Sequence, residues 1–158
     1  MLQTAAVKFN NIACGERHAL AVSTDGRLFT WGCGEMGRLG HGDEDDHMEP
    51  TEIDYLPNFD PVVAIAASSD ASMAILKSGV SYATGSNEFN KIGLTTSIRG
   101  FEKGQQTSFD IAFKTKFSIV KPLKCHEIVD VSMGKTHTVC IDSKLTLQIQ
   151  SSLYIIIH

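Results

Sequence analysis

Short apolar segments alternate with glycine-containing turns along most of the chain. Residues 19–22 (ALAV) form an apolar run, which is typical of a strand buried on both faces. An Asp-Gly pair follows at Asp25 and Gly26, and it tolerates the positive φ angles of a tight hairpin. Residues 28–31 (LFTW) are rich in aromatic and β-branched side chains, which predicts the second strand of that hairpin. Five glycines between residues 32 and 42 then end regular structure.

The same order of elements returns further along the chain. Residues 12–22 (IACGERHALAV) align with residues 65–75 (IAASSDASMAI), and residues 26–40 align with residues 79–93. A third copy begins at Val131, where VSMGKTHTVCI matches the first. Phe9, Val62 and Ile128 hold one apolar place just upstream of the three copies. The structural positions of the repeat are Gly15, His18, Gly26, Trp31, Gly32, Gly40, Gly79, Gly85, Gly93, Gly134 and His137.

These copies divide the chain into three units. Repeat one covers about residues 9–61, repeat two about residues 62–127, and a truncated repeat three about residues 128–158. One unit of short strands cannot bury both of its faces, so neighbouring units must stack. The expected fold is all-β, a partial β-propeller of about two and a half blades.

The third copy departs from the pattern after Ile141. Ser143, Lys144 and Leu145 stand where the hairpin glycine is expected, and no Trp-Gly follows Leu147. We therefore expect repeat three to fail here, and a folded and an unfolded segment 143–158 both stay open. The apolar residues 153–157 predict an unpaired edge through which a marginally stable chain self-associates.

Two charged segments are candidate partner-binding sites. Repeat two is lengthened by a basic insertion, residues 95–125, and insertions in repeat proteins often bind partners. Its candidates are Arg99, Lys103, Lys114 and Lys116. Its four aromatic residues, Phe101, Phe109, Phe113 and Phe117, favour packing onto the blade equally well. Asp43, Glu44, Asp45 and Asp46 open an acidic run that suits a cation or a basic partner, although a solvated loop is the preferred interpretation.

Composition excludes several classes of protein. The chain has 158 residues, 42% of them hydrophobic and 20% charged, which is typical of a globular protein. The net charge of −4 makes nucleic acid an unfavoured partner. No apolar run approaches the roughly 18 residues of a membrane span, and residues 1–11 lack the apolar core of a secretory signal. We expect no membrane association and a cytoplasmic or nuclear location.

Catalytic and metal-binding motifs are weak in this sequence. Residues 32–37 (GCGEMG) match G-x-G-x-x-G, but Arg38–Gly42 does not favour the helix that a nucleotide-binding loop requires. Cys14, His18, Cys33 and His41 do not have the spacing of a common zinc module. His18 and His137 share one repeat position, which favours a buried imidazole bonded to backbone over a catalytic base. Trp31 is interpreted as a packing residue. We expect no catalytic residue, cofactor, metal or small-molecule substrate.

The pattern Gly15-x-x-His18, Asp25-Gly26, Trp31-Gly32 and Gly37-x-Leu39-Gly40 resembles the regulator of chromosome condensation repeat, whose family builds seven-bladed propellers. Residues 84–94 and 134–142 look more particularly like the propeller of a never-in-mitosis-A-related serine/threonine protein kinase. That region follows the catalytic domain and is thought to restrain it.

The resemblance implies a non-enzymatic interaction module, part of an autoregulatory kinase propeller. Its partner would be a kinase domain in cis, and its location would extend to the spindle. The V-A-I-K, H-R-D and D-F-G motifs of a kinase are not in this sequence. The alternative is part of a guanine-nucleotide exchange propeller that acts on the small GTPase Ran.

Overall fold

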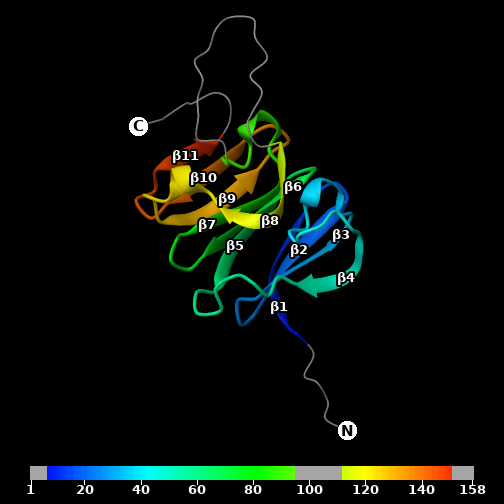
Figure 1. Cartoon of the computed structure of the whole chain (residues 1–158). Coiled ribbons are helices and arrows are strands. Elements are labelled where there is room, and N and C mark those ends of the chain that lie inside the picture. The colour runs from blue at the N-terminus through cyan, green and yellow to red at the C-terminus, as the bar shows by residue number, and fades with distance from the viewer. Residues whose placement is uncertain (1–6, 95–111, 151–158) are drawn as a thin grey trace, which may run out of the picture.

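Three antiparallel sheets make up the regular structure of the chain (Figure 1). The computed structural model describes residues 7–94 and 112–150. The first sheet, blade 1, has four strands in sequence order: β1 Phe9–Cys14, β2 His18–Ser23, β3 Leu28–Gly32 and β4 His47–Glu52. Each strand pairs antiparallel with the next along the chain, as expected when tight hairpins join them.

Blades 2 and 3 repeat this arrangement. Blade 2 contains β5 Val62–Ala67, β6 Ala71–Leu76, β7 Ser81–Ser86 and β8 Phe113–Ile119. In the described residues, blade 3 contains β9 Ile128–Met133, β10 Thr138–Asp142 and β11 Leu147–Gln150. This order confirms the prediction of an all-β partial propeller. The described part of the chain has no helix long and apolar enough to cross a membrane.

Hairpin turns follow the second strand of each blade. Gly26 and Gly79 have φ angles of 85° and 84°, so both predicted turns need the left-handed conformation that glycine adopts freely. Of the two possibilities for the segment after Ile141, the structure shows the folded one as far as Gln150, although the repeat pattern departs there. Leu145 takes the glycine position with φ 62°, and β11 follows it. The Asp142 carboxylate holds this turn because its Oδ1 accepts the N–H groups of Lys144 and Thr146 at 3.0 and 2.9 Å.

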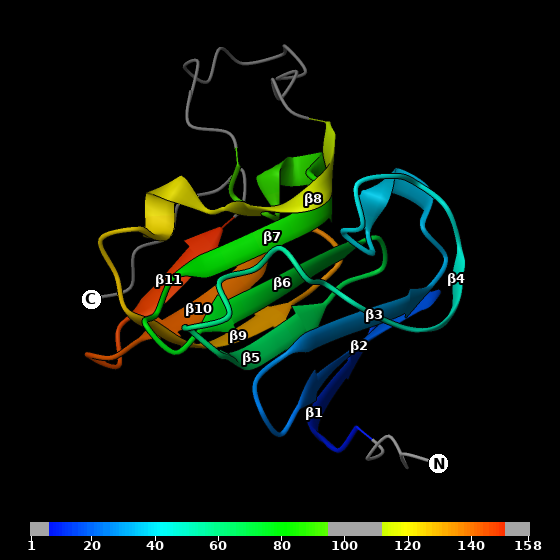
Figure 2. The same ribbon diagram turned by 60° about the horizontal axis from the view of Figure 1, so that its bottom comes forward.

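The blades lie side by side (Figure 2), and the hydrophobic core lies between them. Alternate residues of the central strands point to opposite neighbours, which explains why β6 is buried at all six positions. We call the two contact layers seam 1, between blades 1 and 2, and seam 2, between blades 2 and 3. Seam 1 includes Leu20, Val22, Leu28, Val62, Ile65, Ala74 and Leu76. Seam 2 includes Met73, Ile75, Ala83, Ile128, Val131 and Cys140.

The basic segment 95–125 is not all insertion. Its residues Phe113–Ile119 form β8, the fourth strand of blade 2, and pair with β7. Phe117 is buried in seam 1, whereas Phe113 is exposed. Phe101 and Phe109 lie outside the described residues. The extra length of repeat two therefore falls between β7 and β8. The sequence-based prediction placed the end of the insertion too late, because lysines at alternate positions of β8 resemble a polar loop.

Candidate functional site

The loops that leave the third strand of blades 1 and 2 share one unusual conformation. Each contains a short 3-10 turn, η1 Glu35–Gly37 and η2 Glu88–Asn90. Met36 and Phe89 occupy equivalent places in the two turns, and both have φ 60° and ψ 16°. A non-glycine residue in this left-handed region costs roughly 1–2 kcal/mol. We call these two turns, with Met36 and Phe89, the exit loops.

Both exit loops lie at the same end of the sheets (Figure 2). Met36 and Phe89 are 41% and 40% exposed, so each loop turns a large apolar side chain toward solvent in a strained backbone conformation. Sequence reasoning did not single out these residues. The signal was present, because the two residues align when repeat two is laid on repeat one.

The acidic loop folds back onto the exit loop of blade 1. The N–H of Gly34 donates to Asp46 Oδ1, and the N–H of Met36 donates to Glu44 Oε2, each at 2.9 Å. Asp43 Oδ1 accepts the N–H of Asp45 at 3.1 Å. Three of the four candidate acids thus bond backbone groups of their own blade, and their first role is to hold the exit loop of blade 1 in place.

A buried cation follows each exposed apolar residue. The Arg38 guanidinium donates to the Glu35 carbonyl at 2.7 Å and to the Ser69 carbonyl of blade 2 at 3.3 Å. Lys91 is 1% exposed, and its Nζ lies 2.6 Å from Asp70 Oδ1. Burial opposes ionisation of Asp70, but the hydrogen bond and charge of Lys91 outweigh it and hold the pKa of Asp70 below its ordinary value. These pairs fix the exit loops to the blades.

His18 joins blade 1 to blade 2 through a side-chain hydroxyl. Its Nε2 lies 2.8 Å from Ser72 Oγ, and the Ser72 hydroxyl donates to the Arg38 carbonyl at 2.7 Å. Ser72 therefore accepts from His18, which places the imidazole proton on Nε2. Burial, followed by the nearby Arg38 charge, lowers the pKa of His18 to about 4, so the ring is neutral. The expectation of a buried imidazole is confirmed, but its partner in this hydrogen bond is a hydroxyl.

His137 differs from His18 although both occupy one repeat position. Its side chain is exposed on the side of blade 3 that faces away from blade 2. The expected burial at this position was therefore wrong for His137. The imidazole is covered only where a following blade packs against it. Trp31, the expected packing residue, is half-buried on the opposite outer side, in blade 1.

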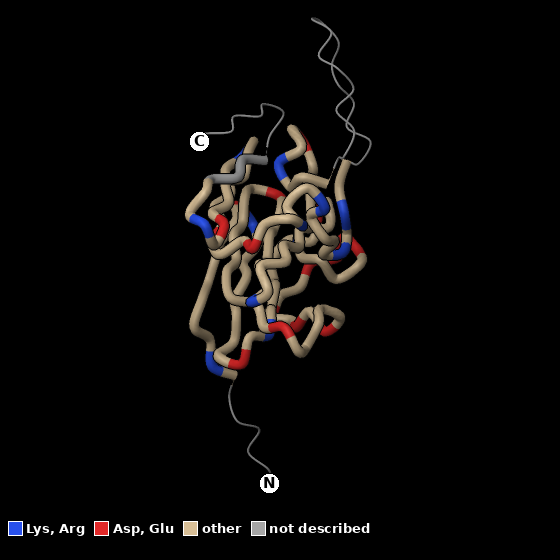
Figure 3. The backbone as a smooth tube through the Cα atoms, turned by 90° about the vertical axis from the view of Figure 1, so that its left-hand side faces the viewer, with Lys and Arg blue, Asp and Glu red and all other residues tan. Residues whose placement is uncertain are grey.

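The acidic loop and the basic strand lie side by side across seam 1 (Figure 3). His41 pairs with Lys116 in an isolated bridge, and the N–H of Gly42 donates to the Thr115 carbonyl at 2.8 Å. Lys116 Nζ lies 5.4 Å from the ring centroid of Tyr55, a cation–π contact. Arg99 and Lys103 lie outside the described residues, so of the basic candidates only Lys114 and Lys116 are placed, both on β8.

Tyr55 clamps the two blades together. Its hydroxyl donates to the Gly40 carbonyl at 2.6 Å and accepts the N–H of Phe117 at 2.8 Å. Burial raises the pKa of Tyr55 to about 12, which keeps the hydroxyl protonated and able to donate. Sequence reasoning missed this residue, because its bonding partners are more than ten residues away in each direction.

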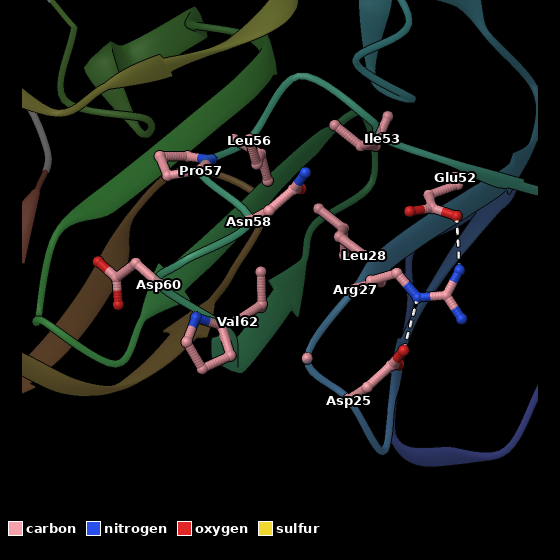
Figure 4. Close-up of a pocket in the computed structure, with 12 residues that line it drawn as sticks. Asp25, Arg27, Leu28, Glu52, Ile53, Leu56, Pro57, Asn58, Asp60 and Val62 are labelled. Atoms are coloured by element: carbon pink, nitrogen blue, oxygen red, sulfur yellow. Dashed lines mark hydrogen bonds and ion pairs between the residues drawn. The ribbon is translucent and has the colours of Figure 1, made fainter.

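A pocket of about 230 Å³ opens beside the first hairpin turn (Figure 4). Arg27 crosses it, with Nε 2.9 Å from Asp25 Oδ2 and Nη1 2.8 Å from Glu52 Oε2. The cation is thus paired from both sides by its own blade. Much of the remaining lining comes from the segment that connects blade 1 to blade 2, including Leu56, Pro57 and Asp60. The pocket is a packing feature of this connection, because Arg27 pairs with Asp25 and Glu52 and the Asp60 carboxylate accepts the N–H of Ser78 at 3.0 Å.

The structure shows where the G-x-G-x-x-G motif and the candidate metal ligands lie. Residues 32–37 lead from β3 into η1, which is three residues long and does not continue as a helix. Within the described ranges 7–94 and 112–150, no group of three or more His, Cys, Asp or Glu side chains is arranged to hold a metal ion. The four cysteines are free, with Cys33 and Cys140 buried and Cys14 and Cys125 exposed.

Protein-family models match part of this chain. Two models of the regulator of chromosome condensation (RCC1) repeat match the chain, over residues 25–75 and residues 9–38. Residues 9–75 of the chain contain RCC1 repeats. The RCC1 pattern accounts for the glycines of the hairpins and exit loops, and it confirms the family resemblance seen in the sequence.

The relatives of these RCC1 repeats include a kinase. Mouse serine/threonine-protein kinase Nek9 is 33% identical over 133 residues, which are 84% of this chain and 13% of Nek9. Human WBSCR16 has a similar fold, with a TM-score of 0.77 at 17% identity over 95% of this chain and 34% of that one. Yeast Prp20p gives 0.72 at 20% identity, over 89% and 32%. The chain thus spans about an eighth of this kinase and a third of either solved propeller.

Proposed function

We propose that the RCC1 blades form a non-enzymatic protein-binding module whose contact surface is the pair of exit loops. The observation that carries this proposal is the repeated conformation of Met36 and Phe89. Both side chains are large, apolar and about 40% exposed, and both stand on a strained backbone. Strained backbone conformations persist only where the surrounding structure holds them in place, and they are common at functional sites.

We further propose that the bound partner is a serine/threonine-protein kinase domain, which the module restrains. The similarity to Nek9 supports this choice of partner. The exit loops suit the task physically, because Arg38 and Lys91 fix them to the blades and little loop entropy is lost on binding. Glu35, next to Met36, is already paired with Arg38 and Arg17, whereas Glu88 precedes Phe89. The complementary surface should therefore be apolar, with a basic group at its border beside Phe89. The proposed location is the cytoplasm, with the nucleus and the spindle as alternatives.

The test adds the 158-residue chain to the purified kinase domain of mouse Nek9 and measures phosphorylation of a generic substrate. We expect inhibition by the wild-type chain. Met36→Asn with Phe89→Asn should weaken binding by about tenfold or more, as for hot-spot residues. Asparagine tolerates the left-handed conformation, so these changes remove apolar surface without adding strain. Met48→Asn is the matched control, because Met48 is 87% exposed on β4, outside the exit loops.

An unchanged inhibition by the double variant would contradict the choice of surface. Absence of inhibition by the wild-type chain would contradict the choice of partner. The alternative function, exchange of guanine nucleotide on a small GTPase, rests on the fold likeness to Prp20p, whose binding to Gsp1p has been described. Faster nucleotide release from Gsp1p at catalytic amounts of the chain would favour that alternative.

A further inference from the structure

Thr51 lies near the end of β4 and has acidic residues on both sides. Glu49 lies two positions before it, Glu52 follows it directly, and Asp54 lies three positions after it. In the described part of the chain, no other serine or threonine has an acid at both the first and the third following position. A kinase with a basic substrate cleft selects such an acceptor by charge complementarity. The sequence around Thr51 therefore has the charge pattern of a phosphorylation site.

The strand that contains Thr51 is paired less regularly than the other strands of blade 1. Three register pairs join β4 to β3, and a shift of register separates His47 from Thr51. Residues 48–50 have no register partner in β3, and Pro50 has no N–H to donate. Local opening of this strand therefore breaks few backbone hydrogen bonds, and it presents an extended acceptor segment to a kinase.

The exposure of Thr51 does not depend on whether another blade precedes blade 1. Its side chain is half-buried. Ser118 has the equivalent place in β8, because Thr51 and Ser118 stand opposite equivalent residues of the third strand, Thr30 and Ala83. The loop of blade 1 that contains Gly42 lies along β8, and Ser118 is half-buried all the same. This position of the fourth strand thus remains accessible beside a neighbouring blade.

The Thr51 hydroxyl already lies beside a group that can bind a phosphate. His47 Nδ1 is 3.1 Å from Thr51 Oγ1, and the hydroxyl donates to the Glu49 carbonyl at 3.0 Å. Since the hydroxyl has a single proton, its oxygen accepts from His47, and the imidazole proton lies on Nδ1. The same N–H group would donate to an oxygen of a phosphate on Thr51, and the negative charge would strengthen that hydrogen bond.

The neighbouring carboxylates leave room for a phosphate. Side chains alternate along a strand, so Glu52 points to the face opposite Thr51, and its Oε2 lies 2.8 Å from Arg27 Nη1. Glu49 and Asp54 are exposed to water, which screens their charges. Repulsion from these three acids is therefore limited.

We propose that Thr51 is a phosphorylation site for a serine/threonine kinase that selects acidic segments, and that His47 binds the phosphate. This proposal does not rest on the partner proposed for the exit loops. In the reaction, Thr51 Oγ attacks the γ-phosphorus of ATP, the bond between that phosphorus and the bridging oxygen breaks, and ADP leaves with the electron pair. The hydroxyl proton passes to a carboxylate base of the kinase. The product gains a charge of roughly −1.5 to −2 at pH 7.

The modified residue is connected to the acidic loop, residues 43–46, through two histidines. The rings of His41 and His47 stack with centroids 4.1 Å apart, and they flank this loop in the sequence. Carboxylates of the loop hold the exit loop of blade 1. A hydrogen bond from His47 to a phosphate on Thr51 therefore changes the environment of His41 as well.

The test incubates the folded 158-residue chain with ATP and purified casein kinase 2, a kinase that selects acidic segments, and locates the phosphate by tandem mass spectrometry. We expect modification of Thr51, retained in Thr51→Ser and lost in Thr51→Ala. Asp54→Asn should lower the initial rate at this residue by about tenfold, because it removes one charge that the kinase recognises. Asp43→Asn is the matched control with the same loss of charge outside the acceptor segment, and its rate should stay within about twofold.

NMR of the histidine rings tests the phosphate contact. Phosphorylation should shift the ring signals of His47 and His41 and leave those of His126, which bonds Asp142 in blade 3. Unfolding of Asp54→Asn would expose Thr51 and raise the rate, so a lower rate reports recognition. Modification of Thr51 in the heat-denatured chain alone would overturn the proposal. So would equal rates for wild type and Asp54→Asn, and unchanged His47 signals would overturn the assigned phosphate contact.

Discussion

Gly15–His18 in blade 1 and Gly134–His137 in blade 3 are one sequence element in two environments. A Cβ atom on Gly15 would lie 2.2 Å from His18 Cε1 and 2.3 Å from the Ser68 carbonyl oxygen of blade 2. A Cβ on Gly134 would lie 3.3 Å from His137 Cε1, with no contact from another blade among its nearest neighbours. Glycine is therefore required at position 15 mainly because blade 2 packs closely against it in seam 1, and less because of the turn.

Repeat two supports the same explanation from its departures. It has Ser68 where the other repeats have glycine, and Ala71 where they have histidine. The two exchanges belong together, because a side chain at the glycine position occupies the space that the imidazole would fill. Seam 2 then lacks the histidine, and Thr138 Oγ1 is buried there without a hydrogen-bond partner in the described structure.

The largest effect is expected from shortening a seam residue. Leu20→Ala should lower the free energy of unfolding by about 2–5 kcal/mol, because Leu20 is fully buried in seam 1 and leaves a cavity. Val139→Ala, at the equivalent place in blade 3, should lower it by less than about 1 kcal/mol. Urea unfolding of dilute protein, followed by the fluorescence of Trp31, measures both. Equal losses would break the comparison between seam and outer face.

The two glycines offer the second contrast. Gly15→Ala should destabilise the chain by about 1–3 kcal/mol, because His18 and the blade 2 backbone must both move. Gly134→Ala should stay within roughly 0.5 kcal/mol, as for surface substitutions. Thermal melts of the two variants beside the wild-type chain decide the point. A larger loss for Gly134→Ala would mean that the turn itself requires glycine.

The third prediction is a pH dependence that arises from the buried His18. The unfolded chain protonates His18 near pH 6.5, whereas the folded chain does so only near pH 4, so stability is lost as pH falls from about 6.5 to 4. Between pH 7 and 4.5, this residue should account for about 2 kcal/mol. His18→Gln should reduce that loss in urea unfolding. Identical pH profiles for wild type and His18→Gln would contradict the buried neutral imidazole.

The smallest effect concerns the third hairpin. Leu145 adopts φ 62° and is 82% exposed, so Leu145→Gly relieves a strained backbone and loses little packing. We expect a gain of up to about 1 kcal/mol, visible as a higher melting temperature. Gly79→Ala in blade 2 is the reverse substitution and should lower the melting temperature, since Gly79 has φ 84° and lies against the backbone of Glu127. A loss of stability in Leu145→Gly would show that the leucine side chain holds the turn.

The strands and hairpins of this protein follow from its sequence. Apolar runs predicted β2, aromatic and β-branched residues predicted β3, and the Asp25-Gly26 pair predicted the turn between them. The offset between repeats then predicted stacked blades. These features depend on local preferences and on period-two patterns, which any strand carries within its own residues.

Contacts between blades were decided by the tertiary structure alone. The sequence does not show that His18 bonds Ser72, that Tyr55 clamps Gly40 to Phe117, or that β8 lies within a segment that looked like a basic loop. Each depends on residues far apart in the chain that meet only when one sheet packs on the next. The same holds for exposure: His18 and His137 read alike, and only the presence of a following blade makes one of them buried and neutral while the other faces solvent.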